Sequence, residues 1–187
     1  MSGRSLFNKI KYLVYFILFL LRFLPSFIRE LLYEIMMFFP TKVGVLFRSI
    51  LVMSLSDCGD NLYIGTNVKI KNFKGLKIGS NVSIHENCFI DAIGGVEIGD
   101  NVSIAHNSSL ISFNHTYSNK ELPIKYNTLF FDKIILKSDV WVGCGSRILA
   151  GSYLNERTIV AAGAIVTSHF ERDSIIAGVP AKVIKGI

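Results

Sequence analysis

Two different hydrophobic patterns divide the chain near residue 55. Before that point, apolar residues come in runs with helical spacing that Pro25 and Pro40 interrupt. After it, one aliphatic residue recurs every six positions over most of the remaining sequence. Neither an α-helix nor an ordinary β-strand has a period of six, so the second pattern predicts a repeat solenoid. We therefore expect an N-terminal helical segment at 1–55 and a solenoid domain at 56–187.

The six-residue repeat predicts short strands joined by tight corners. Each strand can bury only one or two side chains, so the coils must stack on one another to form a core. Glycine follows the first aliphatic residue of each run, and asparagine, which tolerates a positive φ, fills the turns between. The aliphatic positions are Ile64, Ile70 and Leu76; Ile78, Ile84, Ile90 and Val96; Ile98, Ile104 and Leu110; and Val142, Ile148, Leu154, Val160 and Val166. The pattern predicts a mainly β fold.

The first 55 residues predict three short amphipathic helices. The longest uninterrupted apolar run, residues 12–21, is about half as long as the roughly 20 residues of a membrane-spanning helix. Pro25 ends the first helix, Ser26 is expected to cap the second, and Pro40 separates the third. In the second helix, an apolar stripe that includes Phe27, Leu31 and Ile35 lies opposite Arg29, Glu30, Tyr33 and Glu34; in the third, Lys42 and Arg48 lie opposite the stripe.

Basic residues concentrate in the same helical segment. It holds 7 Lys and Arg against 2 Asp and Glu, whereas the other 132 residues hold 13 against 12. This argues against a nucleic-acid partner, because such proteins carry their basic residues on the folded body. Basic amphipathic helices instead favour attachment to a membrane surface with anionic headgroups. Two alternatives stay open: a spanning helix over about residues 10–28, and helices that pack in an oligomer core.

The repeat is interrupted between Leu110 and Ile134. A loop of this length inside a regular solenoid is typical of a functional element, and we place it at about 112–133. Asn114 and His115 lie near its start. Because histidine is suited to general-base chemistry near neutral pH, His115 is the candidate catalytic residue.

Three motifs resemble the hexapeptide-repeat acetyltransferases. They are residues 98–102 (IGDNV) through Asn114-His115, residues 139–143 (DVWVG) and residues 177–184 (AGVPAKVI). The resemblance covers roughly residues 58–187 and is strongest to the galactoside/maltose acetyltransferase branch and to bacterial polysaccharide O-acetyltransferases. It implies a left-handed parallel β-helix and a homotrimer with active sites at the subunit interfaces. It also implies acetyl-CoA as the acyl donor, with no metal.

The resemblance further implies a role for each candidate residue. His115 would remove the proton from an acceptor hydroxyl as that oxygen attacks the thioester, with backbone N–H groups stabilising the oxyanion and no acyl-enzyme. The acceptor-binding candidates are His85, Asn87, Asp91 and Asn114. The CoA-binding candidates are Trp141 and Cys144 beside the pantetheine arm, Ala162 and Thr167 at the adenine end, and Lys182 and Lys185 at the phosphates.

The remaining histidines and the cysteines predict no further chemistry. His85, His106 and His115 are separated by 21 and 9 residues, unlike the two ligands about five residues apart in a carbonic-anhydrase branch of this fold. We therefore expect no metal. Cys58, Cys88 and Cys144 lack CxxC spacing and are expected to be free thiols in a reducing cytoplasm.

These features favour a cytoplasmic, membrane-associated O-acetyltransferase, peripheral at the inner face of the cell membrane. Its acceptor would be a sugar hydroxyl of a bacterial surface polysaccharide or of its lipid-linked precursor. One alternative is an acetyltransferase for a soluble acceptor, such as a nucleotide-linked amino sugar or an antibiotic. An alternative of another class is a non-catalytic β-helix scaffold whose helices assemble a complex.

Overall fold

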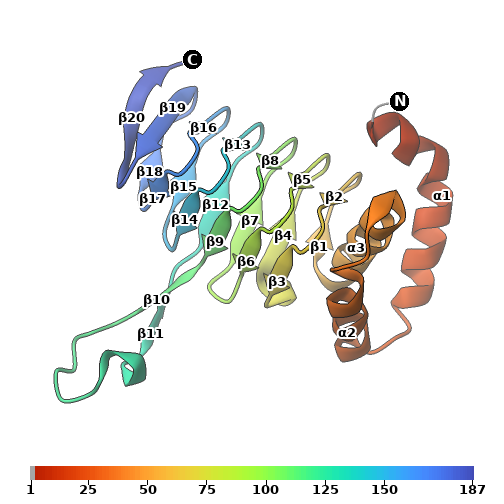
Figure 1. The fold of residues 1–187 in the computed structure, drawn as a ribbon, viewed down its shortest axis with the longest axis horizontal. Helices are drawn as coiled ribbons and strands as arrows, with labels where there is room; N and C mark the ends of the chain where they lie inside the picture. The colour runs from red at the N-terminus through yellow and green to blue at the C-terminus, as the bar shows by residue number, and fades with distance from the viewer. Residues whose placement is uncertain (1–2) are drawn as a thin grey trace.

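The computed structural model describes residues 3–187 as a parallel β-solenoid with three helices at its N-terminal end (Figure 1). The helices are α1 (Gly3–Leu21), α2 (Ser26–Met36) and α3 (Thr41–Leu55), here called the helical cap. Pro25 and Pro40 directly precede α2 and α3, as predicted. The expectation that Ser26 caps α2 is wrong. Pro25 takes the capping position and no side chain bonds there, so Ser26 is the first helical residue.

The solenoid has about six coils, built from three short strands each except the last, which has two. The strands of the first three coils are β1 (Asp57–Cys58), β2 (Tyr63–Ile64), β3 (Lys69–Lys71), β4 (Leu76–Ile78), β5 (Ser83–Ile84), β6 (Phe89–Asp91), β7 (Val96–Ile98), β8 (Ser103–Ile104) and β9 (Ser109–Ile111), with the 3-10 turn η1 (Phe73–Gly75) in the first corner between coils. Those of the last three are β12 (Ile134–Leu136), β13 (Trp141–Val142), β14 (Arg147–Leu149), β15 (Tyr153–Leu154), β16 (Ile159–Val160), β17 (Ile165–Val166), β18 (His169–Phe170) and β19 (Ser174–Gly178). β20 (Ala181–Gly186) then turns back antiparallel to β19.

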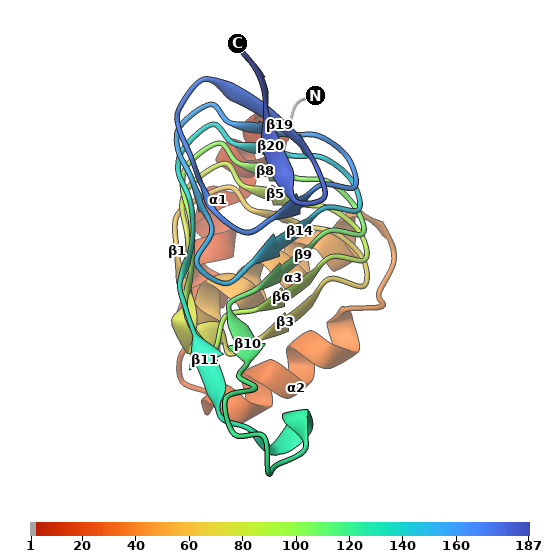
Figure 2. The ribbon, with the colours of Figure 1, turned by 90° about the vertical axis from the view of Figure 1, so that its left-hand side faces the viewer.

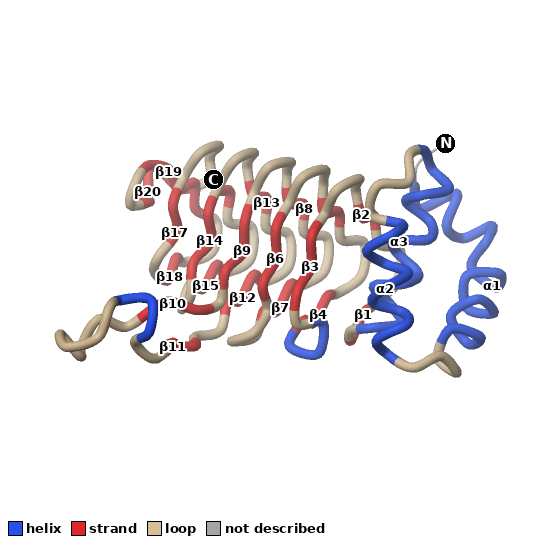
Figure 3. The backbone as a smooth tube through the Cα atoms, turned by 60° about the horizontal axis from the view of Figure 1, so that its bottom comes forward, coloured by secondary structure: helices blue, strands red, loops and turns tan. Residues whose placement is uncertain are grey.

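Corresponding strands of successive coils pair in parallel and form three sheets (Figures 1 and 3). Sheet A has the order β1-β4-β7-β12-β15-β18, sheet B has β2-β5-β8-β13-β16-β19-β20, and sheet C has β3-β6-β9-β14-β17. The predicted aliphatic positions stack inside; in sheet B, Ile64, Ile84, Ile104, Val142 and Val160 are each 1% exposed or less. The prediction of a parallel β-helix with N-terminal helices is confirmed.

The corner between sheets B and C shows why asparagine recurs in the sequence. Successive coils place Asn67, Asn87 and Asn107 at the same corner, with φ values of 58°, 60° and 61°. L-residues rarely adopt this left-handed conformation, and asparagine tolerates it better than most. Gly145 and Gly163 take over the position in the later coils, with φ values of 69° and 73°. The repeat therefore specifies the corners as well as the core.

The helical cap covers the open end of the first coil. The carbonyl groups at that end have no earlier coil to pair with, and a bare sheet edge invites aggregation. Three side chains of α2 and α3 donate to them instead. Tyr33 Oη bonds to Val68 O at 2.7 Å, Arg48 Nε to Ile64 O at 3.0 Å, and Ser49 Oγ to Leu62 O at 3.0 Å. The cap thus replaces a missing strand with side-chain donors.

This arrangement corrects the expected orientation of α2 and α3. Tyr33 and Arg48, expected on outward polar faces, are both 0% exposed. Arg48 also donates to Phe39 O at 2.7 Å, beyond the end of α2. The outward side of α2 is apolar, with Phe27 at 69% and Leu31 at 59% exposure. The physical reason is that the unpaired carbonyls of the first coil need hydrogen-bond donors, so the polar side chains of the helices turn inward.

Helix α1 packs on α3 and makes polar contacts with the solenoid at Asp60. Asp60, just before β2, accepts hydrogen bonds from Tyr15 Oη at 2.5 Å and from Lys11 Nζ at 3.0 Å. Many large apolar side chains of α1 remain exposed, including Tyr12 at 88% and Phe16 at 60%. Among the described residues, no helix is both long and apolar enough to cross a membrane.

The interruption of the repeat forms an arm that projects from the solenoid (Figures 1 and 2). β10 (Phe113–His115) pairs antiparallel with β11 (Leu129–Phe131), and the turn η2 (Ile124–Tyr126) lies between them. We call residues 113–131 the hairpin arm. It begins at the corner between sheets C and A, because Ser112 follows β9 of sheet C and β12 of sheet A resumes the coils.

Candidate active site

The outward face of sheet B carries a row of residues that runs along the whole solenoid. Strand register places Tyr63, Ser83, Ser103, Trp141, Ile159, Ile175 and Lys185 in this row. The hydroxyls of Ser83 and Ser103 are small, so the stretch between Tyr63 and Trp141 is open. Three strand spacings of about 4.8 Å separate these two aromatic residues, roughly 14 Å in all. We call this surface the sheet-B face.

Three of the predicted CoA-binding residues lie on the sheet-B face. Trp141 is 53% exposed in its middle, and Lys185 ends the same row. Lys182 lies next to it on β20, opposite Ala177. Both lysines are exposed, and the described part of the chain places no acidic side chain within ion-pair distance of either. Two uncompensated cations at one end of an open face suit an anionic ligand.

The other predicted CoA-binding residues divide between two corners. Cys144 and Ala162 occupy the corner between sheets B and C in consecutive coils, where Gly163 N donates to Cys144 O at 2.9 Å. They therefore border the sheet-B face. Thr167 is exposed and follows β17, so it lies at the corner between sheets C and A. The structure does not bring it together with the rest within one chain.

Two of the predicted acceptor-binding residues lie at the end of the sheet-B face nearest the helical cap. His85 directly follows β5 and its ring centroid is 5.3 Å from that of Tyr63. Asn87 lies two residues further on, at the corner, where its Oδ1 accepts a hydrogen bond from Asn67 at 2.9 Å. His85 and Asn87 thus lie near one end of the open stretch, and Trp141 lies at the other.

Tyr63 and Glu86 join this group, although the sequence reasoning missed both. Tyr63 Oη donates to Glu86 Oε1 at 2.8 Å. The backbone N–H of Glu86 and the Tyr63 hydroxyl hold the pKa of this carboxyl below its usual value. Burial and the adjacent Glu86 raise the pKa of Tyr63. One signal was visible in the sequence: Tyr63 takes the slot that Ser83 and Ser103 take in the next two coils.

Asp91, Asn114 and His115 lie at the corner between sheets C and A. His115 is exposed at the end of β10, with its ring 6.4 Å from that of Phe113, and Asn114 beside it is exposed too. Asp91 is only 7% exposed. Its Oδ1 accepts hydrogen bonds from Asn72 Nδ2 at 2.6 Å and from Ile93 N at 3.2 Å. In a single chain this carboxylate is therefore engaged in closing its own turn.

The hairpin arm lies across the solenoid from the sheet-B face. In the end-on view the arm extends from the corner opposite sheet B (Figure 2). His115 consequently shares no surface with Trp141 or His85 in the same chain. The predicted residues form two groups, one around His115 and one on the sheet-B face. A site that combines the two groups requires a second copy of the chain.

Comparison with known proteins relates this architecture to acetyltransferases. No family model matches the sequence. WbbJ of Escherichia coli (strain K12), named as a lipopolysaccharide biosynthesis O-acetyl transferase, is 32% identical over 76 residues, which are 40% of this chain and 39% of WbbJ. The 2,3,4,5-tetrahydropyridine-2,6-dicarboxylate N-acetyltransferase of Staphylococcus aureus (strain JH9) is 46% identical over 52 residues, 28% of this chain and 22% of that enzyme. The chain thus spans well under half the length of the curated relatives it matches.

Solved structures agree with the fold over most of the chain. A hexapeptide-repeat acetyltransferase of Vibrio cholerae, VCA0836, complexed with acetyl-CoA, superposes with a TM-score of 0.75 at 19% identity, covering 84% of this chain and 85% of that one. A galactoside acetyltransferase in complex with coenzyme A superposes with a TM-score of 0.74 at 24% identity, covering 87% and 82%. This chain has the hexapeptide-repeat acetyltransferase fold. A solenoid of the opposite hand would not superpose, so the hexapeptide coils here share the hand of those structures.

Within this hexapeptide-repeat fold, two of the three cysteines are poorly suited to nucleophilic chemistry. Burial raises the pKa of both Cys58 and Cys88 to about 11, which disfavours the reactive thiolate. Cys144 lies at a corner and meets its neighbours through its backbone. Among the described residues, no three His, Cys, Asp or Glu side chains converge in a metal-binding arrangement. His115 is exposed on the hairpin arm and lies apart from these cysteines.

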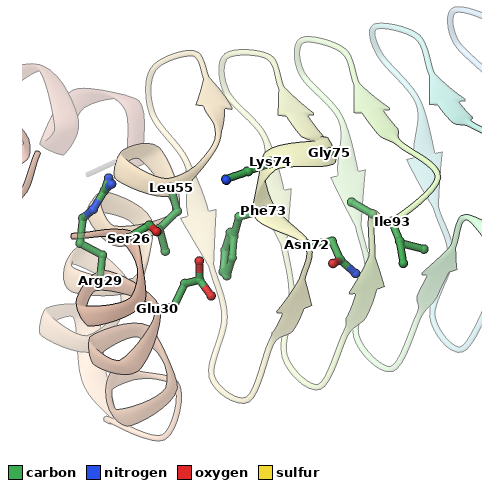
Figure 4. A pocket seen from close by; sticks show the side chains of 10 residues that line it. Ser26, Arg29, Glu30, Leu55, Asn72, Phe73, Lys74, Gly75 and Ile93 are labelled. Carbon is green, nitrogen blue, oxygen red and sulfur yellow. The ribbon is translucent and has the colours of Figure 1, made fainter. Parts of the chain in front are cut away.

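A hollow of about 430 Å³ at the junction between cap and solenoid contains none of the predicted residues. It lies between the first turn of α2 and η1 (Figure 4). Glu30 points toward Phe73 there, while Lys74 extends toward Leu55 (Figure 4). Arg29 also lines it, so charges of both signs meet at its rim. This hollow is therefore separate from the residues predicted to bind acetyl-CoA and the acceptor.

Proposed function

We propose that the protein is an acetyl-CoA-dependent O-acetyltransferase acting on a sugar hydroxyl of a bacterial surface polysaccharide or of its lipid-linked precursor. The observation that carries this proposal is the sheet-B face, where Trp141 stands 53% exposed beside small side chains in a fold shared with CoA-bound acetyltransferases. The similarity to WbbJ, named for lipopolysaccharide O-acetyl transfer, supports the choice of acceptor.

His115 would act as the general base. It would take the proton from the acceptor hydroxyl at one imidazole nitrogen, which makes the oxygen nucleophilic. Acetyl-CoA supplies the activated acetyl thioester that this oxygen attacks. The exposure of His115 on the hairpin arm supports this role, since the base must reach a bound acceptor. The high pKa values of Cys58 and Cys88 support transfer without an acyl-enzyme.

The remaining site residues would bind and orient. On the sheet-B face, Lys182 and Lys185 would pair with CoA phosphates, and Trp141 would wall the pantetheine arm with Cys144 beside it. Ala162 would line the adenine end. His85 and Asn87, together with Asn114 and Asp91, would contact the acceptor. Thr167 would meet the adenine end from a neighbouring surface. Because His115 and Trp141 lie on opposite sides of one chain, we propose a homotrimer with sites between subunits.

The helical cap would hold the enzyme at the inner face of the cell membrane, on its cytoplasmic side. The outward sides of α1 and α2 expose large apolar side chains that a soluble monomer rarely leaves in water. Seven basic residues in the first 55 would add attraction to anionic headgroups. Co-sedimentation with anionic vesicles, lost on deletion of residues 1–40, is the expected result. Full-length protein that never sediments would favour the soluble-acceptor alternative.

The function is tested by acetyl transfer from acetyl-CoA to a lipid-linked or free oligosaccharide acceptor, followed as release of the CoA thiol. His115→Ala should lower the rate by about 10²–10⁴-fold, the usual contribution of a general base. It should leave CoA binding and assembly unchanged. His169→Ala is the matched control, because His169 is also exposed but lies on sheet A. Full activity in His115→Ala would contradict the assignment.

An amine acceptor is the second candidate, favoured by one comparison. The matched region of the Staphylococcus aureus N-acetyltransferase is 46% identical to this chain. Offering the same sugar with an amino group in place of the hydroxyl separates the two functions. We expect faster transfer to the hydroxyl. Faster transfer to the amine would identify N-acetylation as the function in place of O-acetylation. Acetyl-CoA that gives no thermal protection at any concentration would favour the non-catalytic scaffold.

A further inference from the structure

A cavity of about 550 Å³ lies between α1, α3 and the first coil. Its lining is mainly hydrocarbon and includes Ile10, Val14, Leu46 and Ile50. Its volume falls within the roughly 300–1,000 Å³ typical of sites for small molecules. The hydroxyl of Ser49 in the lining is already bonded to Leu62 O. The interior therefore suits an apolar ligand and offers little to a polar one.

Two polar side chains of the lining indicate which kind of polar head group such a ligand carries. Lys42, in the first turn of α3, is exposed, and the described part of the chain places no acidic group within ion-pair distance of it. Tyr63 lies where the lining meets the sheet-B face. Its hydroxyl is bonded to Glu86 and its ring packs near His85. Tyr63 thus belongs both to the cavity lining and to the group that contains the predicted acceptor-binding residue His85.

We propose that this cavity binds the hydrocarbon chain of a phosphate-headed lipid, with Lys42 pairing with the phosphate. A lipid occupant is favoured because the exposed apolar sides of α1 and α2 already present the cap to a bilayer. Lys42 supplies the complementary charge. A head group leaving the cavity past Tyr63 would next meet His85 and, two strands further along, Trp141. This assignment rests on the proposed function in one respect: the head group would carry the sugar acceptor.

Binding of farnesyl phosphate to the full-length protein, measured by titration calorimetry without acetyl-CoA, tests the site. Saturable binding to the wild type is expected. Lys42→Gln should weaken it by about tenfold, the loss of one charge-assisted pair, and should leave the weaker binding of farnesol unchanged. Lys74→Gln is the matched control, an exposed lysine of η1 outside this cavity. Equal effects of the two substitutions, or no saturable binding, would overturn the proposal.

Filling the cavity tests the hydrocarbon chain separately. Leu46→Trp should reduce binding of both farnesyl phosphate and farnesol by more than tenfold. Because Leu46 is partly buried, Val43→Trp at the 51% exposed rim repeats the test with less risk to folding. Unchanged binding in a folded variant would overturn the proposal. So would a change in oligomeric state in place of lost binding, since it would mean that a second copy fills the cavity.

The two proposals can fail independently. His115→Ala should bind farnesyl phosphate normally, since His115 lies on the hairpin arm and not in the cavity. Inactivity toward every acceptor with normal lipid binding would refute the acetyl transfer alone. Acetyl transfer with no lipid binding would refute the cavity site alone.

Discussion

The carbonyl groups of the coils receive their hydrogen bonds from two different kinds of donor. In the solenoid, each coil bonds to the next through the main chain, as in Ser83 N to Val102 O at 2.9 Å and Ser103 N to Val140 O at 3.0 Å. In the cap, side chains provide those bonds, from Tyr33, Arg48 and Ser49. The cap therefore depends on a few particular side chains, whereas the coil-to-coil bonds of the sheets are made by the main chain.

The largest expected effect follows from removing the buried arginine of the cap. Arg48→Met leaves the carbonyls of Ile64, Met36 and Phe39 without the donor that a fully buried side chain supplies, and the Ile64 carbonyl bond is itself buried. We expect the free energy of unfolding to fall by about 3 kcal/mol or more. Urea denaturation of the full chain measures the change.

A solenoid arginine provides the comparison for this change. Arg147 Nη1 also bonds to carbonyls, those of Asn107 at 2.8 Å and Gly145 at 2.9 Å, but the side chain is only half-buried. Water can replace these bonds, so Arg147→Met should cost about 1 kcal/mol or less. Equal costs for the two arginines would break the contrast between cap and solenoid.

A smaller effect is expected where the solenoid does depend on residue type, at its corners. Asn107 has a φ of 61° and is exposed. Asn107→Ala should lower the free energy of unfolding by about 1 kcal/mol, because alanine is strained in this conformation. Asn107→Gly should change it by less than about 0.5 kcal/mol, because glycine adopts a positive φ without strain. Thermal unfolding of both variants makes the measurement, and an alanine variant as stable as the glycine variant would contradict it.

The smallest expected effect concerns the attachment of α1 in acid. The Tyr15 hydroxyl, together with the Lys11 ammonium, holds the pKa of Asp60 below its ordinary value of about 3.9. Because the folded pKa is the lower one, this stabilisation is present above about pH 4 and is lost as the pH falls through the folded value. Asp60 is 37% exposed, so the contribution stays below about 1 kcal/mol.

Hydrogen exchange can detect this loss locally. Protection of α1 amides should fall below pH 4 by more than protection of sheet-B amides, whose bonds join one coil to the next. In Asp60→Asn the difference between α1 and sheet B should no longer change with pH. Parallel loss of protection in both regions would show that Asp60 does not stabilise α1 in preference to sheet B.

The sequence was sufficient for the solenoid and for the location of the hairpin arm. The six-residue period specifies which residues point inward, and the asparagines mark the corners, so Ile64 and Asn67 lie where the pattern predicts. His115 lies near the start of the interruption, as expected. These features are local or repeat at a fixed interval, so a single sequence contains the information.

The orientation of the cap could not be predicted in the same way. Helical spacing shows which residues share a face, but not which face meets the solenoid. Tyr33 and Arg48 donate to carbonyl groups of the first coil, and those groups are unpaired only because the solenoid begins there. The contact of Tyr63 with Glu86 is likewise between residues 23 positions apart, joined by stacking of coils. The proposed site, which combines His115 with the sheet-B face, would need a second chain, and helical or six-residue spacing contains no information about that contact.

The parallel register of sheet B sets a constant spacing between corresponding residues along the molecule. Each coil advances the chain by one strand spacing of about 4.8 Å, so positions in neighbouring coils are separated by a constant step. Three such steps lie between Tyr63 at the cavity and Trp141. The number of coils between them therefore sets the distance that the head group of the proposed lipid must extend from the cavity to the middle of the sheet-B face. One coil more or fewer in this stretch would lengthen or shorten that distance by one strand spacing.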